Sequence, residues 1–269
     1  MRIAITADPY LPVPPRFYGG IERVIDLLVR GLAARGHDVT LFAHPESATS
    51  ATLRAYGVPP HMTRAARLRE LAQVGAGLWD LRRTVDVVHS FGRLAALLPI
   101  LPLRTLPKIQ SYQRAVPWSG VRRAAQLAGG SLRFTGCSTS LYAGEHAAAA
   151  GSHWCTIFNG VDTSRYTPTM SVAHDAPLVF LGRVERIKGP HHAIAIARRA
   201  NRRLILAGNR AVEGADARFY HEEIAPHVDG DRVRYIGAVD DTQKNVLLGS
   251  AAALLMPIEW DEPFGIVMI

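Results

Sequence analysis

The feature that most constrains the fold of this chain is a regular alternation of short apolar segments with longer amphipathic ones. Residues 1–7 form an apolar, β-branched segment that is typical of a buried strand. Residues 20–35 carry apolar side chains at the spacing of one helical face, and Gly36 follows as a favourable helix stop. Residues 37–43 again indicate a strand. A strand, a helix and a strand in this order predict the opening of a parallel sheet.

The same alternation continues along the chain and restarts after residue 177. Before that point the pattern predicts further strands at residues 85–89, 108–111, 133–136 and 155–158, and helices at residues 64–81, 121–128 and 141–149. After it the pattern predicts strands at residues 178–181, 203–207, 233–236 and 252–256, and helices at residues 191–200, 219–225 and 242–248. A last helix is expected to begin near Gly265.

Two successive runs of this kind predict an α/β protein with two Rossmann-like, doubly wound parallel-sheet domains. Residues 159–177 separate the runs, because an Asn-Gly turn signal and a cluster of Pro, Ser and Thr break the periodicity there. We place the domain boundary inside this segment. The N-terminal domain is predicted to span residues 1–165 and the C-terminal domain residues 166–269.

Composition excludes several classes of protein. Hydrophobic residues make up 48% and charged residues 20% of the 269 positions, which is ordinary globular composition. The two cysteines, Cys137 and Cys155, are too few for a disulfide framework and lack the spacing of zinc ligands. Residues 94–103 are apolar but fall short of the roughly 20 residues that span a bilayer. These features, and a first segment unlike a signal peptide, predict a cytoplasmic protein.

The excess of positive over negative charge is confined to the N-terminal part of the chain. Residues 1–170 hold 19 Lys and Arg against 10 Asp and Glu, whereas residues 171–269 hold 12 against 13. A basic half indicates an anionic partner, and a phosphorylated substrate, an anionic membrane surface and nucleic acid all satisfy that requirement. Nucleic acid ranks last, because few aromatic residues lie among the basic ones. Arginine-rich solubility is the alternative that involves no partner.

Ligands of open parallel sheets bind outside the carboxyl ends of the strands, and one predicted loop there carries two cations. Arg183 follows the strand at residues 178–181, and Lys188 comes five residues later, between glycines that permit close backbone approach. A planar guanidinium and an ammonium group at one strand end suit a diphosphate. Two solvated surface cations are the alternative interpretation.

Two other loops carry candidate ligand-binding groups. Glu262, Phe264 and Gly265 follow the last predicted strand, where a carboxylate accepts hydrogen bonds from hydroxyl groups and free backbone N–H groups bind anions. Gly19 and Gly20 open the first helix in the same way. A helix-capping acid and a flexible loop are the respective alternatives. The usual dinucleotide and P-loop fingerprints are absent from the sequence.

Taken in order, the segments GGIERV, NGVD, GRVERIKG and EPFG resemble those of the retaining glycosyltransferases of family 4, which have the two-domain GT-B fold. The resemblance implies that Arg183 and Lys188 bind the diphosphate of a nucleotide-sugar and stabilise the leaving group. It implies that Glu262, Phe264 and Gly265 contact the donor sugar, and that Gly19 and Gly20 approach the diphosphate from the other domain. The loop near Val239 corresponds to the segment that binds the base.

The resemblance also implies possible sugar or acceptor contacts from His89 and from Gln113, which stands where relatives often have a histidine. A lone histidine at a strand end is otherwise a structural residue. No metal ion, cofactor or covalent nucleophile is implied. The implied partners are a UDP- or GDP-hexose donor and an acceptor that is anionic or lies at a membrane surface, with the enzyme in the cytoplasm or peripheral to the inner membrane face.

Members of the family have a second glutamate, which would fall one position after Ile269, and they continue beyond it. The resemblance therefore predicts a chain truncated within the donor-binding motif, with an incomplete C-terminal domain. The leading functional hypothesis is a metal-independent, retaining hexosyltransferase. The alternative is a non-catalytic or inactive nucleotide-sugar-binding module.

Overall fold

Two compact units make up the structure. The computed structural model describes residues 1–57, 63–144 and 153–269. The N-terminal unit comprises Met1–Pro15 and Gly19–Val161, and the C-terminal unit comprises Arg16–Tyr18 and Asp162–Ile269. The predicted domain boundary between residues 165 and 166 stays a prediction. None of the helices in the described ranges is both long and apolar enough to cross a bilayer.

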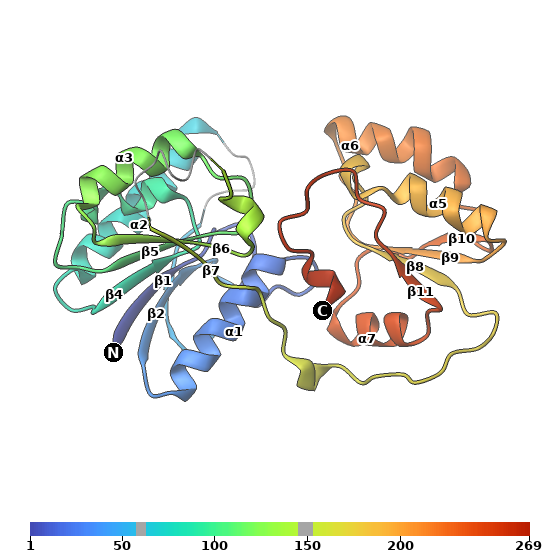
Figure 1. Ribbon diagram of the computed structural model, residues 1–269, viewed down its shortest axis with the longest axis horizontal. Helices are drawn as coiled ribbons and strands as arrows, with labels where there is room; N and C mark the ends of the chain where they lie inside the picture. Colours follow the sequence, from blue (N-terminus) through green and yellow to red (C-terminus); the bar gives the residue numbers. More distant parts are fainter. Residues whose placement is uncertain (58–62, 145–152) are drawn as a thin grey trace. The chain divides into compact units, whose positions relative to one another are not determined.

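The N-terminal unit is built on a seven-stranded sheet in the order β3-β2-β1-β4-β5-β6-β7, and all its strand pairs are parallel (Figure 1). Its strands are β1 (Arg2–Thr6), β2 (Asp38–Ala43), β3 (Thr52–Ala55), β4 (Val87–Ser90), β5 (Lys108–Tyr112), β6 (Leu132–Gly136) and β7 (Trp154–Thr156). Its α-helices are α1 (Gly20–Ala34), α2 (Arg64–Leu81) and α3 (Trp118–Ala128), and its 3-10 helices are η1 (Leu94–Ile100) and η2 (Thr139–Leu141).

Side chains of alternate strand residues pack into two separate cores, one on each face of this sheet, because successive side chains of a strand point to opposite faces. Ile3 and Ile5 of β1 are buried in one core together with Ile25 of α1. Ala4, between them, belongs to the other core, which holds Leu78 of α2 and Val121 of α3. Accordingly, α1 lies on one face of the sheet and α2 and α3 lie on the other (Figure 1). The doubly wound arrangement predicted from the sequence is confirmed.

The C-terminal unit repeats this arrangement with a four-stranded parallel sheet in the order β10-β9-β8-β11. Its strands are β8 (Leu178–Leu181), β9 (Leu204–Ala207), β10 (Val233–Tyr235) and β11 (Ala253–Leu255). Its helices are α5 (Pro190–Arg199), α6 (Gly214–Phe219), which continues into a π-helical turn, η5 (Tyr220–Ile224), and α7 (Asp241–Gly249). Its 3-10 helices are η3 (Thr163–Arg165), η4 (Arg186–Lys188), η6 (Ala225–His227) and η7 (Ile266–Met268). Phe180 and Ile194 share one core, whereas Val179 and Leu247 share the other.

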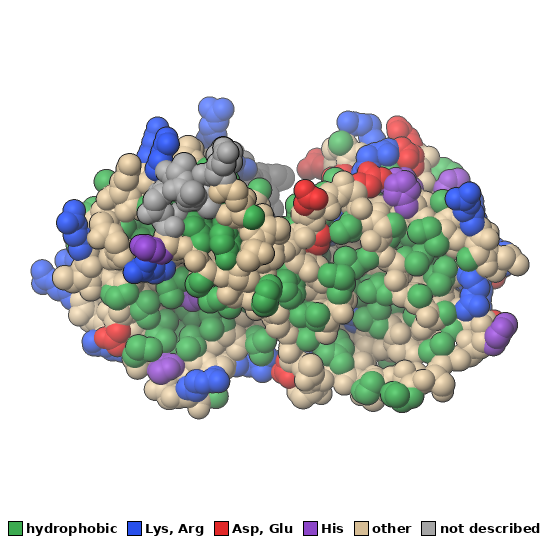
Figure 2. Space-filling view, viewed as in Figure 1, with side chains coloured by type: hydrophobic (Ala, Val, Ile, Leu, Met, Phe, Trp, Pro, Cys, Tyr) green, Lys and Arg blue, Asp and Glu red, His purple; other side chains and the backbone are tan. Residues whose placement is uncertain are grey.

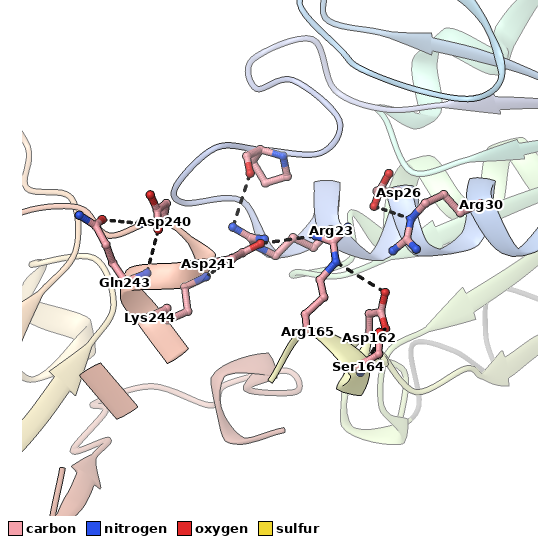
Figure 3. A network of polar contacts seen from close by, with 11 residues as sticks. Arg23, Asp26, Arg30, Asp162, Ser164, Arg165, Asp240, Asp241, Gln243 and Lys244 are labelled. Carbon is pink, nitrogen blue, oxygen red and sulfur yellow. Dashed lines mark hydrogen bonds and ion pairs between the residues drawn. The ribbon is translucent and has the colours of Figure 1, made fainter. Parts of the chain in front are cut away.

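The first turn of the C-terminal unit is tied to α7 by charged side chains (Figure 3). Arg165 lies 3.6 Å from carboxylate oxygens of both Asp162 and Asp241. The helix itself begins with a capping box, in which the Asp240 carboxylate accepts from the Gln243 backbone N–H at 2.8 Å and the Gln243 side chain accepts from the Asp240 backbone N–H at 3.0 Å. Such caps satisfy N–H groups that the helix leaves unpaired.

Most predicted elements agree with the structure, and the helix at residues 64–81 agrees at both ends. The strand β3 was not predicted, because three of its four residues are exposed and show no apolar alternation. The helix expected near Gly265 is only the 3-10 turn η7. The predicted helix at residues 141–149 falls mostly outside the described residues.

Candidate functional site

Each sheet has a point where consecutive strand connections run in opposite directions, and ligands of such sheets bind there, outside the carboxyl ends of the strands. In the N-terminal sheet this point lies between β1 and β4, and in the C-terminal sheet it lies between β8 and β11. The loops that follow these four strands include most of the candidate residues. Each unit therefore carries its own set of candidate groups at a position where the topology favours binding.

In the C-terminal unit, the loops after β8 and β11 meet through an ion pair between Lys188 and Glu262. Both side chains are mostly buried, with 18% and 20% of their surface exposed. Trp260 donates its indole N–H to the Glu262 carboxylate at 3.0 Å, and its ring lies 5.1 Å from the Lys188 ammonium. Two predicted site residues that are 74 positions apart in the sequence are thus in direct contact at the carboxyl edge of the sheet.

Arg183 lies on the same loop as Lys188, directly after β8, and pairs with Glu185. Burial raises the pKa of Glu185, and the neighbouring Arg183 guanidinium opposes that rise. The Nε atom of Arg183 is buried and makes no hydrogen bond with any part of the chain that the structure describes. A buried donor without a partner is costly, so an incoming acceptor atom would be stabilised there.

Glycines hold the loops of this edge in close contact. Gly189 has a φ of 73°, and a Cβ atom at this position would overlap the carbonyl oxygen of Pro257, which follows β11. Gly208, after β9, has a φ of 143° and approaches the carbonyl of Gly182 in the same way. Only glycine combines these backbone angles with such short approaches. The backbones of the loops after β8, β9 and β11 are therefore packed directly against one another.

The remaining donor-site candidates of the C-terminal unit differ in burial: Phe264 is partly buried, whereas the side chain of Val239 is buried in a core. Gly265 has a φ of 74° and precedes η7, and Phe264 beside it is partly buried. The side chain of Val239 is buried with Val179 and Leu247 in the core beneath α7. The buried side chain leaves only the backbone of Val239 for a contact with a base, and the base-binding role of this residue stays a prediction.

Three further side chains of this unit form a group with the geometry of metal ligands. Glu259 accepts from His191 Nε2 at 2.9 Å and from His192 Nε2 at 2.7 Å, and the three ligand atoms lie within 4.8 Å of one another. Desolvation works against the charged form of Glu259, but the hydrogen bonds and charges of the two histidines lower its pKa overall. The sequence analysis did not single out this group, although the adjacent histidines were a visible signal.

In the N-terminal unit, Gly19 and Gly20 begin α1 as predicted. Gly19 has a φ of 144°, and an added Cβ would come within 2.8 Å of the Glu22 carboxylate and 2.7 Å of the Pro15 ring. Glu22 is 9% exposed, and burial raises its pKa, with a further increase from the charge of Asp8. The predicted approach of these glycines to the donor diphosphate stays a prediction.

His89 and Gln113 are held by neighbours within the N-terminal unit. His89 lies in β4 and its Nε2 is 2.7 Å from the Ser111 hydroxyl, which in turn is 2.6 Å from the Thr135 hydroxyl. Burial lowers the pKa of His89 to about 4, so the imidazole is neutral at physiological pH. Gln113 accepts from the Asn159 side chain at 2.8 Å. The hydrogen-bond chain supports a structural role for His89, and the sugar or acceptor contacts of both residues stay predictions.

Comparisons with known proteins match the two halves of the chain to two glycosyltransferase families. Residues 18–165 match the family described as Glycosyltransferase Family 4, and residues 172–269 match the one described as Glycosyl transferases group 1. Glycogen synthases of two Mycobacterium tuberculosis strains, CDC 1551 / Oshkosh and ATCC 25618 / H37Rv, are each 25% identical to this chain over all of its length and 75% of theirs.

Solved structures show the same fold. AviGT4, a glycosyltransferase involved in avilamycin A biosynthesis, is 27% identical over 99% of this chain and 74% of its own, with a TM-score of 0.65. WaaG, a glycosyltransferase involved in lipopolysaccharide biosynthesis, is 17% identical over 99% of this chain and 77% of its own, with a TM-score of 0.66. The first family match alone covers more than half of the residues, so this chain belongs to Glycosyltransferase Family 4, whose members transfer a sugar from a nucleotide-sugar donor.

Proposed function

We propose that this protein is a retaining hexosyltransferase that takes a hexose from a UDP- or GDP-sugar and transfers it to an acceptor hydroxyl without a metal ion. The similarity to glycogen synthases at 25% identity supports a hexose as the transferred sugar. The matches to Glycosyltransferase Family 4 and to Glycosyl transferases group 1 support a nucleotide-sugar as the donor.

The observation that carries the proposal is the pairing of Lys188 with Glu262 beside Arg183 at the carboxyl edge of the C-terminal sheet. An ammonium group has three donors and a guanidinium five, so both cations retain donors for phosphate oxygens after binding their carboxylates. One of these five, the buried Arg183 Nε–H, has no hydrogen-bond partner among the described residues. Glu262 accepts from Lys188 and Trp260 through Oε2, and the lone pairs of its Oε1 are available to a sugar hydroxyl.

These groups suit a transfer reaction in which the enzyme must mainly stabilise the negative charge that develops on the leaving diphosphate. The bond between the anomeric carbon and the diphosphate oxygen breaks, and the electron pair stays with the diphosphate. The acceptor oxygen bonds to the anomeric carbon on the same face, and its proton passes to the departing diphosphate. Arg183 and Lys188 stabilise the negative charge that develops on the leaving group, which is a large contribution in enzymes of many kinds.

Nucleotide binding tests the donor site. We expect either UDP or GDP to raise the thermal stability of the full chain, since a ligand at 100 times its dissociation constant stabilises by about 2.7 kcal/mol. Lys188→Ala should weaken that nucleotide by roughly tenfold to a hundredfold, as expected for a lost charged hydrogen bond. Isothermal titration calorimetry measures the difference.

Arg186→Ala is the matched control, because Arg186 lies in the same 3-10 turn and also pairs with a glutamate, Glu223, away from the candidate site. Its affinity should stay within about twofold of the unmodified chain. Equal losses in the two variants, or no stabilisation by any nucleotide, would contradict the donor site. Release of free nucleotide from a sugar donor in the presence of EDTA then separates a metal-independent enzyme from a binding module.

A further inference from the structure

A cavity of about 630 Å³ opens in the N-terminal unit, apart from the donor-site candidates of the C-terminal unit. It lies at the carboxyl ends of β1, β4 and β5, and its sides come from η1 and α3. The volume is within the range of pockets that hold small molecules. Its position beside the switch point of the sheet is the one at which ligands of such folds bind.

The walls of this cavity are largely apolar. They include Phe91, Leu94 and Leu101 on one side and Ala124 and Leu127 on the other. Leu127 of α3 and Leu98 of η1, which also lines the cavity, are 52% and 55% exposed. An occupant with an apolar body would remove both leucines from water, whereas a short sugar chain would leave its hydroxyl groups against these side chains.

Three of the residues that line the cavity carry a buried polar atom without a partner among the described residues. Gln110 and Tyr112 of β5 are 1% and 7% exposed, and their Oε1 and hydroxyl atoms form no hydrogen bond with the described residues. The Gln110 amide is oriented by its donor, which binds the Gly92 carbonyl at 3.0 Å. Asp8 Oδ1 is a third such atom, while its other oxygen pairs with Arg114. Buried polar atoms of this kind are costly unless a ligand bonds to them, and a hydroxyl group, which both donates and accepts, suits the amide oxygen, the carboxylate oxygen and the phenol alike.

Three arginines line the cavity, and two of them are paired with carboxylates. Arg114 pairs with Asp8, whereas Arg93 lies 3.9 Å from a Glu70 oxygen and donates to the Tyr10 hydroxyl at 2.7 Å. Arg123 of α3 is exposed and has no ion pair or hydrogen bond within the described ranges. A guanidinium that has no carboxylate partner beside an apolar cavity favours an anionic group on the ligand.

We propose that this cavity binds the acceptor, and that the acceptor is a small amphiphile with an apolar ring system, a hydroxyl group and one anionic group. The inference rests on the proposed transferase function, because it names the acceptor class for that reaction. The ring system lies between the leucines of η1 and α3, the hydroxyl donates to Gln110 or Tyr112, and the anion pairs with Arg123.

A matched series of probes tests the proposal without a donor sugar or turnover. Hydroxynaphthoic acid carries all three features, naphthoic acid lacks the hydroxyl, naphthol lacks the anion, and maltotriose lacks the apolar body. We expect saturable binding of hydroxynaphthoic acid by calorimetry, about tenfold weaker binding of each naphthalene analogue, and no binding of maltotriose.

Two pairs of variants locate the probe. Arg123→Gln should weaken hydroxynaphthoic acid by about tenfold and leave naphthol unchanged, whereas Arg122→Gln, on the adjacent helix position that does not line the cavity, should change neither. Leu127→Gln should weaken both probes, and Leu68→Gln, at a leucine of α2 that is 68% exposed, should weaken none. All four side chains are exposed, so the fold should tolerate the changes.

The proposal is overturned if hydroxynaphthoic acid does not bind, if maltotriose binds or displaces it, or if the variants of each pair behave alike. Nucleotide binding in the same preparations keeps the two questions apart. Loss of probe binding with intact nucleotide binding rejects the acceptor class alone. Probe binding without any nucleotide binding rejects the donor site, and it also overturns the assignment of the bound amphiphile as a sugar acceptor.

Discussion

At the scale of single residues, the N-terminal sheet holds a neutral histidine in a hydrogen-bonded row. His89 is surrounded by Phe91, whose ring centroid lies 4.5 Å from the imidazole, and by the Ser111 hydroxyl. Burial disfavours the imidazolium form, which lowers the pKa from 6.5 to about 4. The folded chain therefore binds fewer protons at this residue than the unfolded chain does between these two pH values.

This proton difference predicts a pH dependence of stability. Because the pKa is lower in the folded state, the contribution of His89 is fully present above pH 6.5 and is lost as the pH falls towards 4. The loss amounts to about 3 kcal/mol by pH 4. Chemical denaturation across this range should show a steeper decrease for the unmodified chain than for His89→Gln.

His174→Gln provides the comparison, since His174 is exposed and should leave the pH profile unchanged. Parallel profiles for the unmodified chain and His89→Gln would show that the imidazole is solvated in the folded protein, contrary to the structure.

At the scale of elements, the start of α5 depends on one glycine. Gly189 ends η4 and precedes Pro190, the first residue of α5, and its missing side chain lets the loop after β11 lie against this turn. The contact holds Lys188 beside Glu262. The contact between Lys188 and Glu262 therefore depends on the glycine that precedes α5.

We predict that Gly189→Ala destabilises the protein much more than Gly230→Ala does. Both glycines have positive φ angles, of 73° and 83°, so both substitutions incur the left-handed penalty of about 1–2 kcal/mol. Only at Gly189 does the added Cβ overlap backbone, whereas nothing lies within 4 Å of it at Gly230. Thermal denaturation compares the two variants, and equal losses would show that the two loops do not touch.

At the scale of the whole molecule, each unit has its own sheet with a core on either face. In the N-terminal unit the cores include Ile25 and Ile100, and in the C-terminal unit they include Ile194 and Leu247. The basic side chains do not form a single patch on the face shown in Figure 2. The Lys and Arg side chains there are distributed over both units. That distribution gives no support to nucleic-acid binding on this face.

Separate cores predict local responses to core substitutions. Ile194 is 2% exposed, and Ile194→Ala should cost about 2–5 kcal/mol through a cavity in the C-terminal unit. Hydrogen exchange of the full chain should accelerate in β8, β9 and α5 and change little in β1 and β4. Ile100→Ala, at a fully buried residue of the N-terminal unit, should give the opposite pattern. Equal acceleration in both units would show that they unfold as one.

The sequence by itself determined the fold class, because the two periodicities on which it depends are local. Apolar runs of strand length and the helical spacing at residues 20–35 follow from neighbouring residues, and the structure confirms both. The motifs around Arg183 and Glu262 were visible for the same reason. The edge strand β3 was missed, because exposed residues carry no apolar period.

Only the tertiary structure decided which of these residues meet. Lys188 contacts Glu262 because parallel strands bring the ends of β8 and β11 to one edge, and strand order is not encoded in any local pattern. Likewise, Gln110 and Tyr112 were ordinary strand residues in the sequence, and their unpartnered atoms appear only when η1 and α3 are placed beside β5. Local spacing predicts elements, whereas a binding site depends on contacts between residues that are distant along the chain.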